Sequence, residues 1–299
     1  MPSSTAPTEV PADRTAGAVS LPVARGRRAA RPRAAVRFVA GLVLLAGVLY
    51  TAALAALWLG QERLLFQPVV LDPARPLSTE PDVHERVVDV PGARLSVLEL
   101  RLPDPKGVVF FLHGNGGNLE SWFVNTAFYR QANYDLVMPD YRGYGKSTGR
   151  IDGESQLQAD MQAVWEQVAP RYQGRRVVFY GRSLGTGLAA GLAAKVQPDL
   201  TILVSPYLSM VALARQHYPW VPAPVLRYPL RTDEQLPRIR TPVLLLHGDR
   251  DELIPLAHSQ ALLPLAPRAR LVVVPGAGHA DLQASDSYRQ ALRTALQDP

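Results

Sequence analysis

A run of 23 uncharged residues at 38–60, FVAGLVLLAGVLYTAALAALWLG, constrains this chain more than any other feature. As a helix the run spans about 34 Å, enough to cross the roughly 30 Å hydrocarbon core of a bilayer. Trp58 lies near one end, where an indole suits the membrane interface. We therefore expect a transmembrane helix over residues 36–60, retained as a signal anchor. A cleaved signal peptide is the alternative, because Ala53-Leu54-Ala55 resembles a cleavage site, although the apolar run is longer than a usual signal-peptide core.

Most of the net charge of +6 lies ahead of this run. Residues 1–37 contain seven Arg against Glu9 and Asp13, and only Arg63 and Arg75 follow the run closely. The positive-inside rule then predicts a single-pass protein with a cytoplasmic N-terminus and everything after residue 60 on the extracytoplasmic side. Because the basic tail adjoins the apolar run, we expect a membrane rather than nucleic acid as its partner. Residues 1–35 are rich in Pro, Ala, Ser and Arg without apolar periodicity, which is typical of disorder.

Beyond a Pro-containing linker at 61–84, short apolar runs alternate with longer amphipathic segments. The expected strands are 86–90, 94–100, 107–112, 135–138, 176–180, 200–204, 242–246 and 270–274. The expected helices are 119–131, 153–168, 184–196, 256–265 and 281–296. This alternation is typical of a mostly parallel sheet covered by helices on both faces, so we expect one α/β domain over residues 85–299.

Residues 206–240 interrupt the alternation with six Pro and four aromatic residues. A long insertion over a compact sheet is either a lid or binding loop, or a surface excursion whose aromatic side chains pack on the sheet. We describe it as lid-like. If it is a lid, Tyr207 and Trp220 are the candidates for contact with a substrate.

The strongest local signal is GRSLG at 181–185, which follows an expected strand and opens an expected helix. That context is required of a nucleophile elbow, in which a sharp turn exposes Ser183 at the carboxyl end of the sheet. Glycines at positions 181 and 185 suit the turn, because a Cβ atom would crowd the backbone there. The Leu184 N–H lies at a helix N-terminus, where backbone donors stabilise developing negative charge.

A serine nucleophile needs a base and a carboxylate that orients the base. His279, in the segment GAGHAD, follows the last expected strand. It lies C-terminal to Ser183, which agrees with the order Ser, then Asp or Glu, then His along chains that carry a nucleophile elbow. The segment HGDRD at 247–251 follows the preceding strand and offers two carboxylates. We prefer Asp251 to Asp249, because an Asp in the turn that leaves a strand commonly bonds the local backbone.

The second oxyanion donor is expected in the loop after the strand at 107–112, which reads HGNGGN from His113. Its glycines let the backbone approach a substrate oxygen, and the Asn115 N–H is the expected donor. His113 is expected to bond loop backbone, and His217 and His258 are expected at the surface. Cysteine is absent and no H-x-x-x-H or H-E-x-x-H spacing occurs, so we expect neither a metal nor a cofactor.

Taken in chain order, HGNGGN, DYRGYGKSTG, GRSLG, HGDRD and GAGHAD resemble the α/β-hydrolase family over residues 60–299. Within that family, the layout resembles serine hydrolases that carry one N-terminal membrane anchor. The resemblance implies an α/β-hydrolase fold, with an eight-stranded, mostly parallel sheet, helices on both faces and one transmembrane helix before it. It also implies a set of site residues: Ser183 as nucleophile, Asp251 as acid, His279 as base, and Asn115 and Leu184 as oxyanion donors.

The expected function is hydrolysis of a carboxylic ester or thioester by a membrane-anchored serine hydrolase. The expected substrate is a small molecule or lipid with an apolar acyl group. A serine peptidase or amidase is an alternative, because the same three side chains can cleave amides. An acyltransferase that uses an alcohol acceptor and a non-catalytic, membrane-tethered binding protein of the same fold are further alternatives. The sequence does not indicate an oligomeric state.

Overall fold

A computed structural model describes residues 32–297 of the 299-residue chain. The chain divides into two compact units, Met1–Tyr50 and Thr51–Pro299, each considered by itself. Most of the tail expected to be disordered, residues 1–31, lies outside the described residues.

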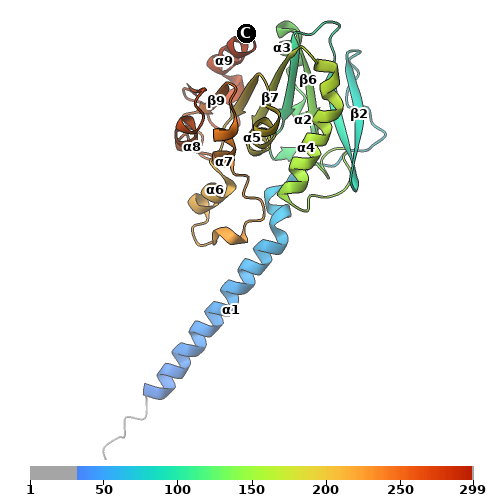
Figure 1. The fold of residues 1–299 in the computed structure, drawn as a ribbon. Helices are drawn as coiled ribbons and strands as arrows, with labels where there is room; N and C mark the ends of the chain where they lie inside the picture. The colour runs from blue at the N-terminus through green and yellow to red at the C-terminus, as the bar shows by residue number, and fades with distance from the viewer. Residues whose placement is uncertain (1–31, 298–299) are drawn as a thin grey trace, which may run out of the picture. The chain divides into compact units, whose positions relative to one another are not determined.

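One long helix, α1 (Pro32–Leu65), contains the whole of the expected span (Figure 1). The most apolar 18-residue window within Arg33–Leu65 has a mean hydropathy of 2.3, and none of that window is buried. By length and composition alone, it is the one helix within residues 32–297 that could cross a membrane. The helix continues to Leu65, so the segment expected as a linker from residue 61 begins as helix.

The second unit is built on an eight-stranded sheet with the strand order β10-β9-β8-β7-β4-β6-β3-β2. Its strands are β2 (Val83–Val90), β3 (Ala93–Leu100), β4 (Gly107–Leu112), β6 (Tyr134–Pro139), β7 (Arg176–Arg182), β8 (Leu200–Val204), β9 (Val243–Gly248) and β10 (Ala269–Val274). β3 runs antiparallel to both its neighbours, β2 and β6, and all other pairs are parallel. The mostly parallel eight-stranded sheet is therefore confirmed. A separate two-stranded pair joins β1 (Gln67–Pro68) to β5 (Gly116–Gly117).

Helices cover both faces of this sheet (Figure 1). They are α2 (Leu119–Trp122), α3 (Thr126–Ala132), α4 (Glu154–Val168), α5 (Leu184–Val196), α6 (Met210–His217), α7 (Thr232–Gln235), α8 (Ala257–Leu262) and α9 (Asp286–Gln297). Five 3-10 turns accompany them: η1 (Ala169–Tyr172), η2 (Ala223–Val225), η3 (Leu236–Arg238), η4 (Leu263–Leu265) and η5 (Leu282–Ala284). The expected single helix at 119–131 is wrong: it is interrupted before Asn125, whose φ of 62° is left-handed and incompatible with a continuous helix.

Two buried apolar clusters lie on opposite faces of the sheet. One takes side chains from α4, α5 and α8, such as Met161, Leu188 and Leu262. The other takes side chains from α3 and α9, such as Tyr129 and Leu292. Each helix contributes its apolar stripe, because residues three and four apart share one helical face. The sheet is thus shielded on both sides and the carboxyl ends of its parallel strands form one edge.

The insertion at 206–240 packs against the last turns of α1. The Gln61 side-chain amide donates to Val225 O at 2.9 Å, and its oxygen accepts from the Arg227 N–H at 2.7 Å. The Arg227 guanidinium pairs with Glu62, and the Tyr228 hydroxyl donates to the same carboxylate at 2.8 Å. These contacts fix the insertion beside the last turns of α1, within the second unit.

Candidate active site

Ser183 occupies a sharp turn between β7 and α5. Its backbone angles, φ 50° and ψ −119°, are ones that a non-glycine residue rarely adopts. The turn needs small neighbours: a Cβ atom on Gly185 would lie 2.1 Å from Leu112 O, and one on Gly181 would lie 2.5 Å from Gly185 O. The Ser183 N–H donates to Val204 O at 2.9 Å, which ties the strained residue to β8. The segment therefore has the geometry of a nucleophile elbow.

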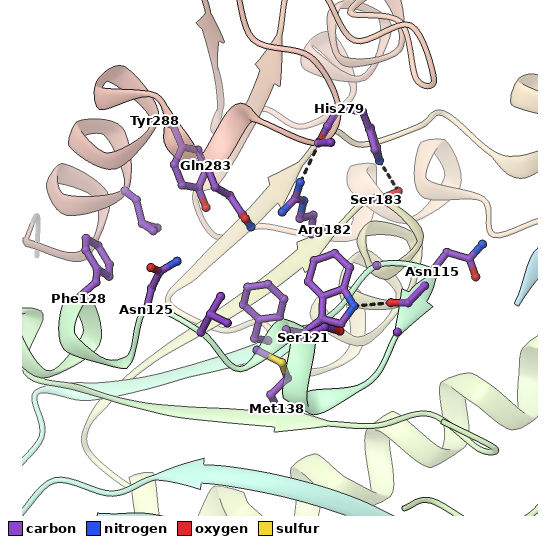
Figure 2. Close-up of a pocket in the computed structure, with 18 of the residues that line it drawn as sticks. Asn115, Ser121, Asn125, Phe128, Met138, Arg182, Ser183, His279, Gln283 and Tyr288 are labelled. Atoms are coloured by element: carbon purple, nitrogen blue, oxygen red, sulfur yellow. Dashed lines mark hydrogen bonds between the residues drawn. The ribbon is translucent and has the colours of Figure 1, made fainter. Parts of the chain in front are cut away.

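Three side chains from distant parts of the chain meet at this turn. His279 Nε2 lies 3.0 Å from Ser183 Oγ, and His279 Nδ1 lies 2.8 Å from Asp251 Oδ2. A dashed line marks the contact between His279 and Ser183 in Figure 2. Asp251 follows β9 and His279 follows β10, and these strands are parallel neighbours that end at the same edge of the sheet. The structure thus brings the expected nucleophile, base and acid into one chain of hydrogen bonds.

The environment of Asp251 keeps its carboxylate ionised. Burial alone would raise its pKa, but hydrogen bonds from His247, His279 and the Ile254 N–H outweigh burial and hold the pKa well below its ordinary value. A permanent negative charge beside Nδ1 stabilises a protonated imidazole. Asp249, the alternative acid, instead accepts a hydrogen bond from the Gly276 N–H at 2.7 Å; it bonds backbone, but that of the loop after β10 and not of its own turn.

Two backbone N–H groups, of Leu184 and Asn115, are the expected oxyanion donors. Leu184 is the first residue of α5, so its N–H has no acceptor within the helix. Asn115 lines the same cavity as Ser183. Its side-chain oxygen accepts hydrogen bonds from Tyr144 Oη and Gln67 N, both at 3.1 Å, and the side chain points away from the cavity in Figure 2. The role of the Asn115 backbone N–H as second oxyanion donor stays a prediction.

His113 has the structural role expected of it. The ring is fully buried, with Nδ1 2.7 Å from Gly114 O and Nε2 3.3 Å from an oxygen of Asp140. His113 is thus fixed inside the loop and lies in no hydrogen bond with Ser183 among the described residues.

A cavity of about 760 Å³ opens in front of Ser183 and His279, on the face of the sheet that carries α2, α3 and α9. Its apolar walls include Phe111, Trp122, Phe128, Met138, Tyr288 and Leu292. Its polar lining includes Asn125, Arg182 and Gln283 (Figure 2). Groups of His, Asp or Glu that could hold a metal ion do not occur in the part of the chain that the structure describes.

Neither aromatic residue expected to contact a substrate lines this cavity. Tyr207 is buried beneath the elbow, where its hydroxyl donates to Leu184 O at 2.9 Å. It reaches that position because Gly187 has no side chain: a Cβ there would lie 2.5 Å from the Tyr207 hydroxyl. Trp220 is half-exposed in the insertion and also lies outside the cavity lining. No residue of 206–240 covers the Ser183 cavity, so the insertion is not a lid over it.

His258 is a second correction, because it is buried rather than at the surface. Its Nδ1 accepts a hydrogen bond from the Leu208 N–H at 3.1 Å, and Nε2 lies 3.2 Å from Gln216 Oε1. The imidazole therefore holds the start of the insertion against α8. His217 is exposed, as expected.

Sequence reasoning missed the residues that shape the cavity. Arg182 lies inside the GRSLG motif, and a charged residue at the buried end of a strand was a signal that could have singled it out. Phe128, Tyr288 and Leu292 come from α3 and α9, where only the amphipathic spacing marks the face that turns inward.

A parallel α/β sheet with a serine elbow, a histidine and a buried aspartate at its carboxyl edge defines an α/β-hydrolase. Comparison with known proteins agrees: the family described as serine aminopeptidase, S33, matches residues 103–228. The chain is also 31% identical to alpha/beta hydrolase domain-containing protein 17B of Homo sapiens over 209 residues, 68% of this chain and 70% of that protein. The chain therefore belongs to the α/β-hydrolase family, and it is a hydrolase.

Solved structures show the same fold at low identity. An esterase of Pyrococcus furiosus matches with a TM-score of 0.63 and 17% identity, over 78% of this chain and 97% of that one. A membrane phospholipase A, described as a bacterial virulence factor, matches with a TM-score of 0.56 and 20% identity, over 88% of this chain and 99% of that one. At these identities the likeness concerns the fold.

Proposed function

We propose that this chain is a membrane-anchored serine hydrolase that cleaves carboxylic esters or thioesters through an acyl-enzyme on Ser183. The observation that carries the proposal is the hydrogen-bond chain from Ser183 through His279 to Asp251, which opens on a largely apolar cavity.

The chemistry follows from the positions of these groups. His279 Nε2 takes the proton from Ser183 Oγ as Oγ attacks the carbonyl carbon, and the Asp251 carboxylate stabilises the imidazolium that forms. The Asn115 and Leu184 N–H groups donate to the oxyanion, each contributing about 3–4 kcal/mol in the transition state. The imidazolium then protonates the leaving alcohol or thiol. Water, deprotonated by the same His279, attacks the acyl-enzyme and releases the acid and free Ser183.

The cavity walls support an apolar acyl substrate. Phe128, Tyr288 and Leu292 offer a surface that an alkyl chain can cover, and such burial is favourable by roughly 25 cal/mol per Å². An acyl ester, lipid-like or small, is therefore the proposed substrate.

The decisive test is the Ser183→Ala variant of the full-length protein in detergent, assayed with 4-nitrophenyl acyl esters. We expect at least about a 1,000-fold loss of kcat with an unchanged unfolding temperature, because the variant removes only the nucleophile. Ser287→Ala, at an exposed position of α9, is the matched control and should keep full activity. Esterase activity that persists in Ser183→Ala would remove the proposal.

A serine peptidase is the second candidate, because the matching family is described as a serine aminopeptidase. Parallel assays of 4-nitrophenyl acyl esters and aminoacyl 4-nitroanilides separate the two. Turnover of the anilides at a higher kcat/KM than the esters supports the peptidase, and the reverse supports the esterase.

The proposed anchor is α1, with the N-terminus in the cytoplasm and the hydrolase domain on the other side. The apolar helix and the Arg-rich segment before it support this orientation. Because the chain has no cysteine, single cysteines report topology cleanly. In spheroplasts, a membrane-impermeant maleimide should label Ser287→Cys, whereas Ser20→Cys should react only after lysis. The opposite pattern contradicts the orientation.

A further inference from the structure

We infer that the cavity recognises an anionic group of the substrate, a carboxylate or a phosphate, through Arg182. The inference rests on the proposed ester hydrolysis and narrows its substrate class to apolar acyl esters that also carry a negative charge near the scissile bond.

Arg182 is the last residue of β7 and directly precedes the nucleophile. It is 6% exposed, yet it lines the cavity, and Figure 2 shows its guanidinium projecting into it beside His279. The charge therefore lies within the cavity, next to the reacting groups and away from bulk water.

The contacts of Arg182 leave its charge unbalanced. One nitrogen, Nη2, donates to the backbone oxygen of His279 at 2.9 Å, and the guanidinium carbon lies 5.3 Å from the centre of the Trp122 ring. Neither partner is an anion. Within residues 32–297, no carboxylate forms an ion pair with Arg182. A guanidinium has five N–H donors, and one of those of Arg182 forms the hydrogen bond to His279 O, so most of its donors are left for a ligand.

The other buried arginine, Arg142, shows how the charge of a purely structural guanidinium is balanced in this fold. Two arginines are buried among the residues that the structure describes, Arg142 and Arg182. Arg142 is paired through two nitrogens with Asp160, a buried carboxylate that balances its charge. Burying a charge without a counter-ion is strongly unfavourable. Arg182 is the buried arginine without such a partner, and it is the one that faces a cavity.

The rest of the cavity lining strengthens the argument. Among the described residues that line it there is no Asp or Glu, whereas a second arginine, Arg289, lies at its edge. Arg289 is largely balanced, since it lies 2.6 Å from an oxygen of Asp286 on the same helix. The cavity thus has a positive interior between apolar walls. A carboxylate or phosphate that accepts two N–H groups of Arg182 complements it in charge and shape.

The test compares esters that differ in charge, with the full-length protein in detergent. Mono-4-nitrophenyl adipate is compared with its methyl ester, which places the anion on the acyl side. 1-Hexanoylglycerol 3-phosphate is compared with 1-hexanoylglycerol, which places it on the leaving group. We expect kcat/KM to favour the anionic member of at least one pair by about 10-fold or more, mainly through a lower KM, since charged hydrogen bonds have that strength. The pair that shows the preference identifies which side of the ester carries the anion.

Three variants connect the preference to Arg182. Arg182→Gln should bring the ratio of the two kcat/KM values close to one, and Arg182→Lys should keep part of the preference. Arg293→Gln, at an exposed position of α9 outside the cavity lining, should leave the ratio unchanged. If Arg182→Gln lowers both members of a pair equally, Arg182 only positions the His279 loop and the inference is wrong. If Arg182→Gln does not fold, the comparison of kcat/KM values for the wild-type protein decides by itself. In that case, equal kcat/KM values for the charged and uncharged members of both pairs overturn the inference. Hydrolysis of 4-nitrophenyl hexanoate by the wild-type protein is measured in parallel. If the wild type does not hydrolyse this ester, the proposed function itself is rejected.

Discussion

Replacing Asp251 by Asn tests the electrostatic core of the site. Asn keeps the shape of Asp, so the Leu253 and Ile254 N–H groups that donate to Oδ1 retain an acceptor. The group that changes is Oδ2, which lies 2.8 Å from His279 Nδ1. An amide nitrogen at that position cannot accept the Nδ1–H, and the negative charge that stabilises the imidazolium is gone.

The size of the effect follows from that geometry. Loss of the triad carboxylate in serine hydrolases of this mechanism lowers kcat by about 10⁴-fold, which corresponds to roughly 5.4 kcal/mol at 1.36 kcal/mol per tenfold. We expect a decrease of this order for Asp251→Asn. Folding should persist, because the variant is isosteric.

Asp249→Asn is the matched control, two residues away in the same loop. Its Oδ1 accepts one backbone hydrogen bond, from the Gly276 N–H, and an amide oxygen can replace it. We expect kcat within about threefold of wild type and a change in the free energy of unfolding below about 1 kcal/mol.

The assay is kcat with a 4-nitrophenyl acyl ester, alongside the thermal unfolding midpoint of each variant. The reasoning is refuted if folded Asp251→Asn keeps more than a tenth of wild-type kcat, or if Asp249→Asn loses as much activity as Asp251→Asn.

The elbow, the insertion and His258 each give a further prediction. Gly185→Ala places a Cβ 2.1 Å from Leu112 O and should lower the free energy of unfolding by about 3 kcal/mol in a denaturant titration. Gly153→Ala is the control, because its Cβ would meet nothing within 4 Å. Equal losses of stability in the two variants would contradict the account of the turn. Gln61→Leu leaves Val225 O and the Arg227 N–H without their partner and should lower the free energy of unfolding in detergent by about 1–3 kcal/mol. An unchanged midpoint of denaturant unfolding would show that this contact is not stabilising. Burial, with the nearby His247 and His217, lowers the pKa of His258, while the Asp251 carboxylate opposes this weakly. The unfolded chain therefore binds this proton more readily than the folded one, so stability should be full above about pH 6.5 and fall as the pH drops below it; His258→Gln should flatten the decline, and an equally steep decline in the variant would refute the assignment.

The sequence predicts that Ser183, Asp251 and His279 come together because each lies in a short motif at a strand end, and the structure places their side chains in hydrogen-bond contact. HGDRD begins within the end of β9 and GAGHAD lies just after β10; these strands are parallel neighbours, so the geometry of the sheet brings Asp251 and His279 together. The glycines of GRSLG are equally informative, since Gly181 and Gly185 lie where any Cβ would overlap the backbone. Chemistry that depends on local turns and on strand order can thus be inferred from the chain.

The cavity could not be predicted in the same way. Its walls combine residues of α3 and α9, which are distant in sequence, and the face that each helix turns inward depends on how both pack on the sheet. Tyr207, in contrast, is expected from the sequence to bind substrate and does not line the cavity. An aromatic residue in a Pro-rich insertion is typical of a binding loop, but the absence of a side chain at Gly187 leaves space for Tyr207 in the core. Ion pairs that form only in the folded state have no signal in the sequence. Arg142 pairs with Asp160, whereas Arg182 pairs with no carboxylate among the described residues, and the sequence does not distinguish the two arginines in this respect.

Covalent labelling of Ser183 tests the central claim most directly. The full-length protein in detergent is treated with a fluorophosphonate, which reacts with activated serines, and digested for mass spectrometry. The account predicts one adduct, on the peptide that contains Ser183, and none in Ser183→Ala. A folded protein that hydrolyses esters while Ser183 stays unmodified, or that is modified on another serine, contradicts it.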